Sequence, residues 1–248
     1  MGCILKGGGG LYSRMAVGAV LLAAGSGSRM GTRPKCLLEL GGVPLIRRLL
    51  IALSGAGVDE LVVVLGHHAE LIEPLVQAFP VTVVHNPRPD DGQVSSQRIG
   101  LAALGARLDA VVVALADQPL LNAQDITALI AAYKKRPEGA QVVFPQVGEE
   151  RGNPVIFSNE VREQILSNSA QIGCRQWQAA NAAAVAPWAT DNRRYRVDID
   201  TQDDIERFQR DTGHALRWPA AMALSVAPSV VLPVVLPVVL PVVLPVRA

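Results

Sequence analysis

Residues 16–40 read "AVGAVLLAAGSGSRMGTRPKCLLEL", an apolar run followed by a loop of small and cationic residues. The run at 16–23 carries no charge, and continuous apolar runs of this length are typical of strands in a parallel sheet that is buried on both faces. In open α/β sheets, ligands bind beyond the carboxyl ends of such strands. The stretch therefore predicts the fold class and also the place of a ligand site.

The alternation of strands and helices continues beyond this first strand. Three further β-rich runs predict strands at 60–66, 81–85 and 110–116. Between the runs, apolar residues recur at helical spacing in segments 43–55, 68–78, 95–107 and 122–135. Strands separated by helical crossovers predict a Rossmann-like, doubly wound α/β domain with a mostly parallel sheet.

After about residue 140 the pattern loosens. Strand-like segments are "QVVFPQ" (141–146), "GNPVIFS" (152–158) and "YRVDID" (195–200), and helices are expected at 159–167, at 173–182 and from Thr201 onward. Thr201 is followed by Asp203 and Asp204, which predicts an N-cap with negative charge in the first helical turn. We expect these elements to extend the same sheet, so that one domain covers residues 15–217.

Both ends of the chain look foreign to this domain. Residues 1–14 form an N-terminal extension in which Lys6 stands where an N-myristoylation motif has Ser or Thr, and which lacks the apolar core of a signal peptide. Residues 218–248 end in a low-complexity tail that repeats V-V-L-P. A proline at every fourth position removes helical hydrogen bonds, which favours extended or polyproline-like structure over a membrane span.

Composition narrows the classes of partner. The formal net charge of +1 over 248 residues excludes a broad electrostatic field, so neither nucleic acid nor an acidic membrane is expected as the main partner. The cysteines, Cys3, Cys36 and Cys174, are odd in number and scattered, which predicts a reducing cytoplasmic location, with Cys36 as a buried thiol. His67 and His68 have no carboxylate or cysteine at ligand spacing and are predicted to be surface or capping residues.

The loop after the first strand suits a polyphosphate. Gly25 and Gly27 let backbone N–H groups approach a phosphate closely, and three cations follow within seven residues: Arg29, Arg33 and Lys35. The loop is neither of the common glycine-rich phosphate motifs, because Lys35 is followed by cysteine and "GSGSRMG" places its last glycine one residue late. Tight packing would explain the glycines alone, but it would not require the cations.

The sequence resembles the nucleotidyltransferases of the GT-A-like α/β fold, and within them the molybdenum cofactor cytidylyltransferases. The resemblance extends from about residue 17 to residue 208. Five motifs carry it in the expected order: "LLAAGSGSRMGTRPKCLLELGGVPL" (21–45), "SSQRIGLAAL" (95–104), "ADQPLL" (116–121), "RGNPVIFS" (151–158) and "VDIDTQDDI" (197–205). Each motif alone is weak, whereas the ordered set is specific.

The resemblance implies a role for each matching position. Arg29 and Lys35 would neutralise the triphosphate, and with Asp117 they form the implied catalytic set. Ser96 would read the edge of the cytosine base. The implied nucleotide-binding residues are Leu22, Ala23, Ala24, Gly25, Arg29, Lys35 and Ser96. The acceptor would face Gly152 and Asn153, although Cys174 and Arg175 nearby depart from the small residues expected in the relatives.

The implied cofactor is Mg²⁺, a hard cation that binds carboxylate oxygens together with substrate phosphates. Asp117 directly follows an apolar strand, and Asp200 would be the second metal ligand, with Asp198 as the alternative because alternate residues of a strand share one face. Each aspartate has a simpler interpretation as a helix cap, and Ser96 could equally serve only to start a helix.

The implied reaction is transfer of CMP from CTP to the terminal phosphate of molybdopterin or of Mo-molybdopterin, with release of pyrophosphate. The product would be the cytosine dinucleotide form of the cofactor, destined for a molybdoenzyme. The motifs "LAAG" and "DQP" stand where the guanylyltransferase relatives have "LAGG" and "DTP", and both favour cytosine.

Two alternatives remain open. One is a nucleotidyltransferase with another nucleotide, such as GTP, or with another phosphorylated acceptor. The other is a non-catalytic nucleotide-binding accessory protein for molybdoenzyme maturation. The presence of Arg29, Lys35, Asp117 and Asp200 argues against the second, because a lapsed enzyme is expected to lose phosphate or metal ligands.

Overall fold

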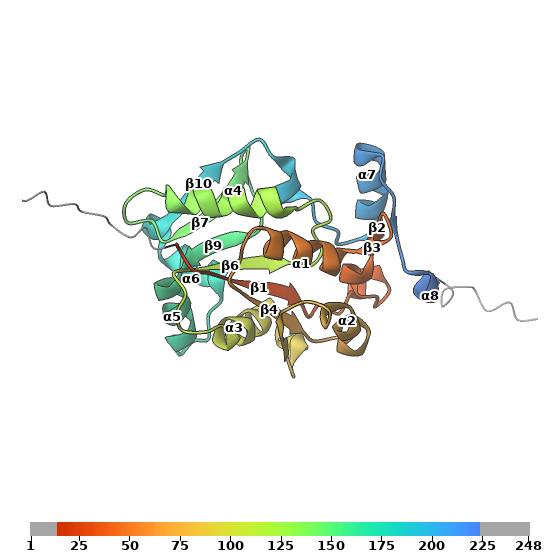
Figure 1. Ribbon diagram of the computed structural model, residues 1–248, viewed down its shortest axis with the longest axis horizontal. Coiled ribbons are helices and arrows are strands. Elements are labelled where there is room, and N and C mark those ends of the chain that lie inside the picture. The colour runs from red at the N-terminus through yellow and green to blue at the C-terminus, as the bar shows by residue number, and fades with distance from the viewer. Residues whose placement is uncertain (1–13, 224–248) are drawn as a thin grey trace, which may run out of the picture. The chain divides into compact units, whose positions relative to one another are not determined.

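The structure, a computed structural model, describes residues 14–223 (Figure 1). The chain divides into two units, residues 1–218 and 219–248. Within the second unit only residues 219–223 are described, and they include the short helix α8 (Ala220–Ala223). Residues 1–13 of the predicted N-terminal extension and the whole V-V-L-P repeat lie outside the described residues, so the proposed domain limits remain a prediction.

A mixed, mostly parallel sheet forms the centre of the first unit. Its strand order is β10-β7-β9-β6-β1-β4-β5, with β8 paired to β7. The strands are β1 (Val17–Ala23), β4 (Glu60–Leu65), β5 (Thr82–His85), β6 (Ala110–Leu115), β7 (Val142–Val147), β8 (Glu150–Arg151), β9 (Val155–Ser158) and β10 (Val185–Ala189). β1 runs parallel to β4 and β6 on either side, whereas β9 is antiparallel to both β6 and β7. The predicted fold class and the four strands of the first half are therefore confirmed.

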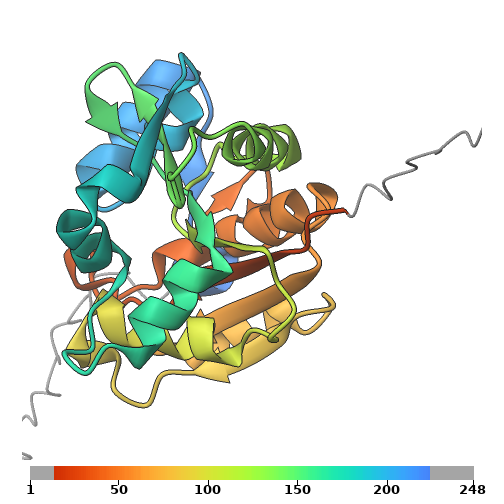
Figure 2. The ribbon, with the colours of Figure 1, turned by 90° about the vertical axis from the view of Figure 1, so that its left-hand side faces the viewer.

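Helices cover both faces of this sheet (Figures 1 and 2). α1 (Leu45–Gly55) and α4 (Ala123–Lys134) pack together on one face, and α3 (Gln93–Ala103) and α5 (Asn159–Ser167) lie on the other. α2 (Ala69–Val76) contacts α1, and α6 (Cys174–Ala180) packs with α3 and α5 in one apolar cluster. This cover explains why all seven residues of β1 are buried and why the strand reads as a continuous apolar run.

A small second sheet joins the loop after β1 to the end of the first unit. Its antiparallel strands are β2 (Glu39–Leu40), β3 (Val43–Pro44) and β11 (Leu216–Arg217), and α7 (Gln202–Thr212) packs beside it. Met30 from the loop, Ile199 and Phe208 of α7 share one apolar cluster there. This packing brings the segment that contains Asp200 next to the loop that contains Lys35.

The predicted strand at 195–200 is wrong. A 3₁₀ turn (η5, Arg193–Arg196) occupies its first half, and the residues that follow pair with no strand among residues 14–223. The Asn192 side chain accepts a hydrogen bond from the Arg194 N–H and so favours the turn. The helix predicted from Thr201 is confirmed as α7, with Thr201 as N-cap in a capping box with Asp204.

Candidate active site

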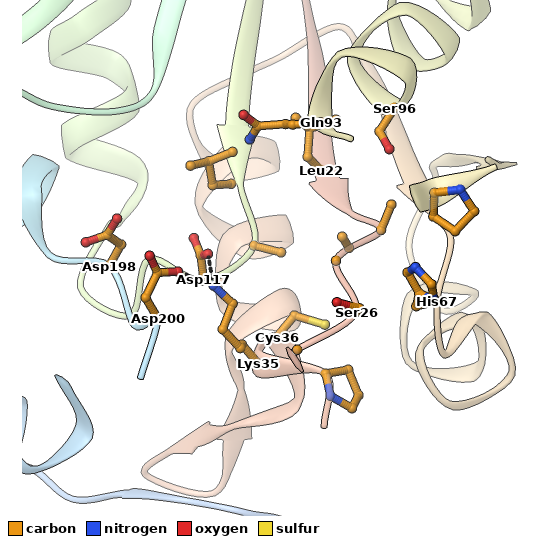
Figure 3. Close-up of a pocket in the computed structure, with 18 of the residues that line it drawn as sticks. Leu22, Ser26, Lys35, Cys36, His67, Gln93, Ser96, Asp117, Asp198 and Asp200 are labelled. Carbon is orange, nitrogen blue, oxygen red and sulfur yellow. Dashed lines mark hydrogen bonds and ion pairs between the residues drawn. The ribbon is translucent and has the colours of Figure 1, made fainter. Parts of the chain in front are cut away.

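A cavity of about 640 Å³ opens at the carboxyl ends of β1 and β6 (Figure 3). Residues of the loop after β1, the N-terminal turn of α3, the end of β6 and the segment before α7 line it. All the predicted site residues except Gly152 lie on its wall: Leu22, Ala23, Ala24, Gly25, Arg29, Lys35, Ser96, Asp117, Asn153 and Asp200. Residues that are far apart in the sequence thus meet at the edge of the sheet where ligands are expected.

Two glycines shape the loop after β1. Gly27 has a φ of +64°, and a Cβ built there would lie 1.9 Å from the Arg33 carbonyl oxygen. The Gly27 carbonyl in turn accepts hydrogen bonds from the N–H groups of Met30 and Thr32, at 2.8 and 3.0 Å. Gly25 differs, since a Cβ there would meet nothing within 4 Å. The loop therefore needs Gly27 for its own conformation, whereas Gly25 exposes backbone to the cavity.

A charged cluster lies at the floor of the cavity. The Lys35 Nζ lies 2.8 Å from Asp117 Oδ2 and 2.5 Å from Asp200 Oδ1, and it donates a hydrogen bond to each (Figure 3). The Arg29 guanidinium forms a second ion pair with Asp200, at 3.1 Å. The Lys35 and Asp117 side chains are each only 18% exposed, so their ion pair is poorly screened by water.

The pKa shifts follow from this arrangement. Burial on its own would lower the pKa of Lys35, but the charges and hydrogen bonds of Asp117 and Asp200 outweigh it, and the pKa rises above 10.5. Burial also opposes ionisation of Asp200, yet Lys35 and Arg29 together hold its pKa below 3.8. Asp198 lines the same cavity, and burial and the charges of Asp117 and Asp200 raise its pKa. Lys35 and Arg29 thus stabilise the ionised form of Asp200, whereas the ionised form of Asp198 is disfavoured.

The donor set fits a divalent cation that substrate oxygens complete. Asp117 Oδ1 is buried and has no hydrogen-bond partner, although its other oxygen binds Lys35. A buried carboxylate oxygen without a partner costs free energy, which a bound cation would recover. No three His, Cys, Asp or Glu side chains within residues 14–223 form a metal-binding group. A divalent cation held by one or two carboxylates takes its remaining ligands from substrate phosphates and water.

Ser96 and His67 face the cavity from the opposite wall (Figure 3). Ser96 is 4% exposed, and its hydroxyl oxygen accepts a hydrogen bond from the Asn86 side-chain amide at 2.9 Å. The hydroxyl proton of Ser96 can therefore be directed to a ligand. His68 is at the N-cap position of α2, but its side chain makes no capping hydrogen bond and lies 3.1 Å from the Ser26 carbonyl oxygen. His67 lines the cavity and pairs with Asp90 at 3.1 Å.

A buried glutamine side chain holds the segment around residue 153 in place by a hydrogen bond. Gln118 is buried, and its side-chain amide donates to the carbonyl oxygens of Asn153 and Tyr195, both at 3.3 Å. Gly152 packs against Tyr195, whose carbonyl oxygen would lie 2.8 Å from a Cβ at that position. The structure therefore brings Asn153 to the cavity and leaves Gly152 behind it. Gln118 of the "DQP" motif does not line the cavity. It holds the segment around Asn153 in place through its hydrogen bonds.

The buried Asp125 carboxylate holds the chain segment that precedes Asp200 in place. The Asp125 carboxylate, 2% exposed, accepts hydrogen bonds from the Arg194 guanidinium at 2.6 and 2.9 Å and from the Asn192 amide at 2.8 Å. The Tyr195 hydroxyl donates to the Asp125 carbonyl oxygen at 2.7 Å. Further along, the Ile199 N–H donates to the Asp117 carbonyl oxygen at 3.1 Å. The fold thus ties the segment before Asp200 to α4 and to the end of β6.

Sequence reasoning missed several lining residues. Gln93, Asp90 and Arg175 lie in segments with no strong motif, and only the unexpected arginine at 175 gave a signal. Cys36 lines the cavity as well, but it is 6% exposed, and burial raises the pKa of its thiol to about 12. The prediction of a buried thiol is confirmed.

Residues 19–187 match the family model of the MobA-like NTP transferase domain. The chain belongs to this family. It is 28% identical over 202 residues to nicotine blue oxidoreductase of Paenarthrobacter nicotinovorans, covering 77% of this chain and 96% of that protein. It is 33% identical over 178 residues to the bifunctional protein GlmU of Mycobacterium avium, but this match covers 67% of this chain and only 36% of GlmU. The chain thus spans about a third of that relative.

Several solved structures have the same fold. A nucleotidyl transferase from Methanothermobacter is 26% identical and superposes with a TM-score of 0.65, covering 79% of this chain and 97% of that one. Rv0371c from Mycobacterium tuberculosis gives a TM-score of 0.66 at 24% identity, with 79% and 99% coverage. The family model, the GlmU relatives and the nucleotidyl transferase from Methanothermobacter show that the protein is a nucleotidyltransferase. Among residues 14–223, the helices are all too short or too polar to cross a bilayer.

Proposed function

We propose that this nucleotidyltransferase transfers CMP from CTP to the terminal phosphate of molybdopterin or Mo-molybdopterin and depends on Mg²⁺. One observation carries the proposal: a single cavity joins a glycine-rich cationic loop to two aspartates, one of which has a buried oxygen without a partner. The loop suits a triphosphate, and the aspartates suit the cation that accompanies it. Rv0371c, which has a similar fold, has been crystallised in complex with manganese, and this supports a divalent cation as the cofactor here.

The chemistry needs positioning and charge rather than a covalent nucleophile. An oxygen of the acceptor phosphate forms a bond to the α-phosphorus of the nucleotide. The bond from that phosphorus to the bridging oxygen of the β-phosphate breaks, and pyrophosphate leaves with the electron pair. The acceptor phosphate is largely a dianion at neutral pH, since its second pKa is about 6, and so no general base is required. Nothing is oxidised or reduced.

Each charged residue has a defined part in this reaction. Arg29 and Lys35 neutralise the triphosphate and the departing pyrophosphate, in a site where charge stabilisation counts most. Asp117 and Asp200 hold Mg²⁺, which supplies further positive charge to the phosphates when bound. In the structure Lys35 forms ion pairs with both aspartates. A divalent cation on the aspartates would take over this task and leave Lys35 for phosphate.

The preference for cytosine rests on Ser96 and Ala24. Because Asn86 donates to the Ser96 oxygen, the hydroxyl is set to donate in turn, and cytosine presents the acceptors O2 and N3 on its pairing edge. Guanine presents two donors, N1–H and N2–H, and a single acceptor, O6, on its pairing edge. The methyl group of Ala24, where guanylyltransferase relatives have glycine, also narrows the room for a purine.

Turnover tests the proposal. Purified protein is incubated with Mg²⁺, molybdopterin and either CTP or GTP, and the pterin product is identified by mass spectrometry. We expect the cytosine dinucleotide with CTP and at most a trace of product with GTP. The Ser96→Ala variant should lose much of this preference while it keeps its fold. Equal products from both nucleotides would refute the cytosine preference, and no dinucleotide with either would refute the acceptor.

A further inference from the structure

A small recess continues the active-site cavity on the side of Asn153. It has a volume of about 30 Å³, and Gln93, Leu115, Asn153 and Arg175 line both the recess and the main cavity. A group bound in the recess would therefore be within reach of a nucleotide in the main cavity. Arg151 and Asn153 of the recess belong to the motif "RGNPVIFS", but Arg175 and Gln178 belong to none of the motifs.

The recess carries positive charge without a compensating carboxylate. Arg151 and Arg175 line it, and no Asp or Glu does, whereas Asp117 and Asp200 line the main cavity. Within residues 14–223, neither guanidinium forms an ion pair or donates a hydrogen bond. Arg151 stacks over the Phe144 ring at 4.2 Å, which fixes its position while leaving its N–H groups available.

The electrostatics of the recess favour an anion. Burial lowers the pKa of Arg151, and the charge of Arg175 lowers it further, so the two guanidinium groups repel each other. Cys174 supplies no counter-charge, because burial raises the pKa of its thiol to about 12. An oxyanion between the arginines would relieve this repulsion and pair with both groups.

A buried side-chain oxygen without a partner is a second observation that points to a ligand in the recess. Gln178 lines the recess and is 7% exposed. Its side-chain nitrogen donates to the Cys174 carbonyl oxygen at 2.9 Å, while its side-chain oxygen is buried without a partner. A buried acceptor of this kind is expected to receive a hydrogen bond from a ligand or from water.

We propose that the recess is the subsite for the acceptor. Arg151 and Arg175 bind an oxyanion of the phosphate-monoester class, and the Gln178 oxygen accepts a hydrogen bond from an N–H or O–H group of the same molecule. This inference rests on the proposed function, because it takes the second ligand to be the acceptor of the nucleotidyl group. It assigns the binding of that acceptor to side chains beyond Gly152 and Asn153.

Calorimetric titration of the full chain with inorganic phosphate tests the subsite. The titration is carried out with Mg²⁺, with and without a saturating, non-hydrolysable CTP analogue that keeps phosphate away from Arg29 and Lys35. Removal of one charge-assisted contact should weaken phosphate binding about tenfold in Arg175→Gln, and more in the double variant with Arg151→Gln. Arg175 is exposed, so its variant folds even if loss of the Phe144 stacking unfolds the other. Arg107→Gln, an exposed arginine outside both cavities, is the matched control and should bind phosphate like wild type.

The outcomes separate this proposal from the proposed function. Phosphate affinity in Arg175→Gln within twofold of wild type would overturn the subsite, as would absence of binding to wild type at millimolar phosphate. If the CTP analogue binds and phosphate binding is independent of Arg175, the subsite is wrong and the cytidylyl function stands. If phosphate binding depends on Arg175 but the analogue does not bind, the subsite stands and the choice of CTP is wrong.

Discussion

Replacement of Gly27 by alanine should damage the nucleotide loop in a way that the geometry quantifies. A left-handed backbone costs a residue with a Cβ about 1–2 kcal/mol. At Gly27 the new methyl carbon would also lie 1.9 Å from the Arg33 carbonyl oxygen, so the chain from Gly27 to Arg33 has to shift by about 1 Å to restore ordinary contact. We expect the variant to lose about 2 kcal/mol or more of the free energy of unfolding, which for a domain of this size lowers the melting temperature by about 4–8 °C.

Gly25→Ala provides the matched control two residues away. A methyl group there meets no protein atom within 4 Å, and Gly25 is not in the left-handed region, so the melting temperature should not change. The methyl group does enter the space that the phosphates or ribose would occupy. Calorimetry with CTP and thermal unfolding, measured on both variants, distinguish the two effects. The reasoning is refuted if Gly27→Ala melts within about 1 °C of wild type and binds nucleotide equally well.

Further predictions concern the charged residues. Asp117→Asn should lower kcat for pyrophosphate release by at least about 100-fold and change nucleotide affinity much less, which steady-state kinetics and calorimetry would reveal. Lys35 holds the pKa of Asp200 below its ordinary value of 3.8. The stability that this ion pair provides is therefore present above about pH 4 and is lost as the pH falls through the lowered pKa. The free energies of unfolding in urea of wild type and Asp200→Asn should converge as the pH is lowered from 6 to 3. Asp125→Ala should lower the free energy of unfolding, measured in urea, by about 2–3 kcal/mol. This is less than the loss of a fully buried ion pair would cost, because Arg194 is 42% exposed. A loss under about 0.5 kcal/mol would contradict this prediction.

Most of the fold could be predicted from local pattern. The apolar runs of β1, β4 and β6 are buried on both faces, which makes their signal unambiguous. β10 could not be predicted in the same way, because Pro187 interrupts it and, among residues 14–223, the strand pairs with β7 alone at the edge of the sheet. The error at 195–200 has a different cause, since side-chain contacts of Asn192 and Asp125, rather than hydrophobic period, set the conformation there.

Some residues of the candidate site could likewise be predicted from the sequence, and others could not. Residues that follow strands or belong to a glycine-rich loop, such as Lys35 and Asp117, could be predicted because strand ends converge at one edge of the sheet. Gly152 was predicted to face the acceptor, whereas the structure places it against Tyr195, a contact that no sequence pattern announces. Gln178 reaches the recess only through the packing of α6 and carried no signal in the sequence, whereas Arg151 belongs to the motif "RGNPVIFS" but was given no role there.

The location of a bound metal ion tests the account most directly. Crystals of the full chain would be grown with Mn²⁺, as a stand-in for Mg²⁺ with an anomalous signal, and with a non-hydrolysable CTP analogue. The account predicts an anomalous peak at about 2.2 Å from oxygens of both Asp117 and Asp200, completed by phosphate oxygens, with the triphosphate against Arg29 and the backbone at Gly25. A manganese ion bound away from these aspartates, or a triphosphate that does not contact the loop after β1, would contradict it.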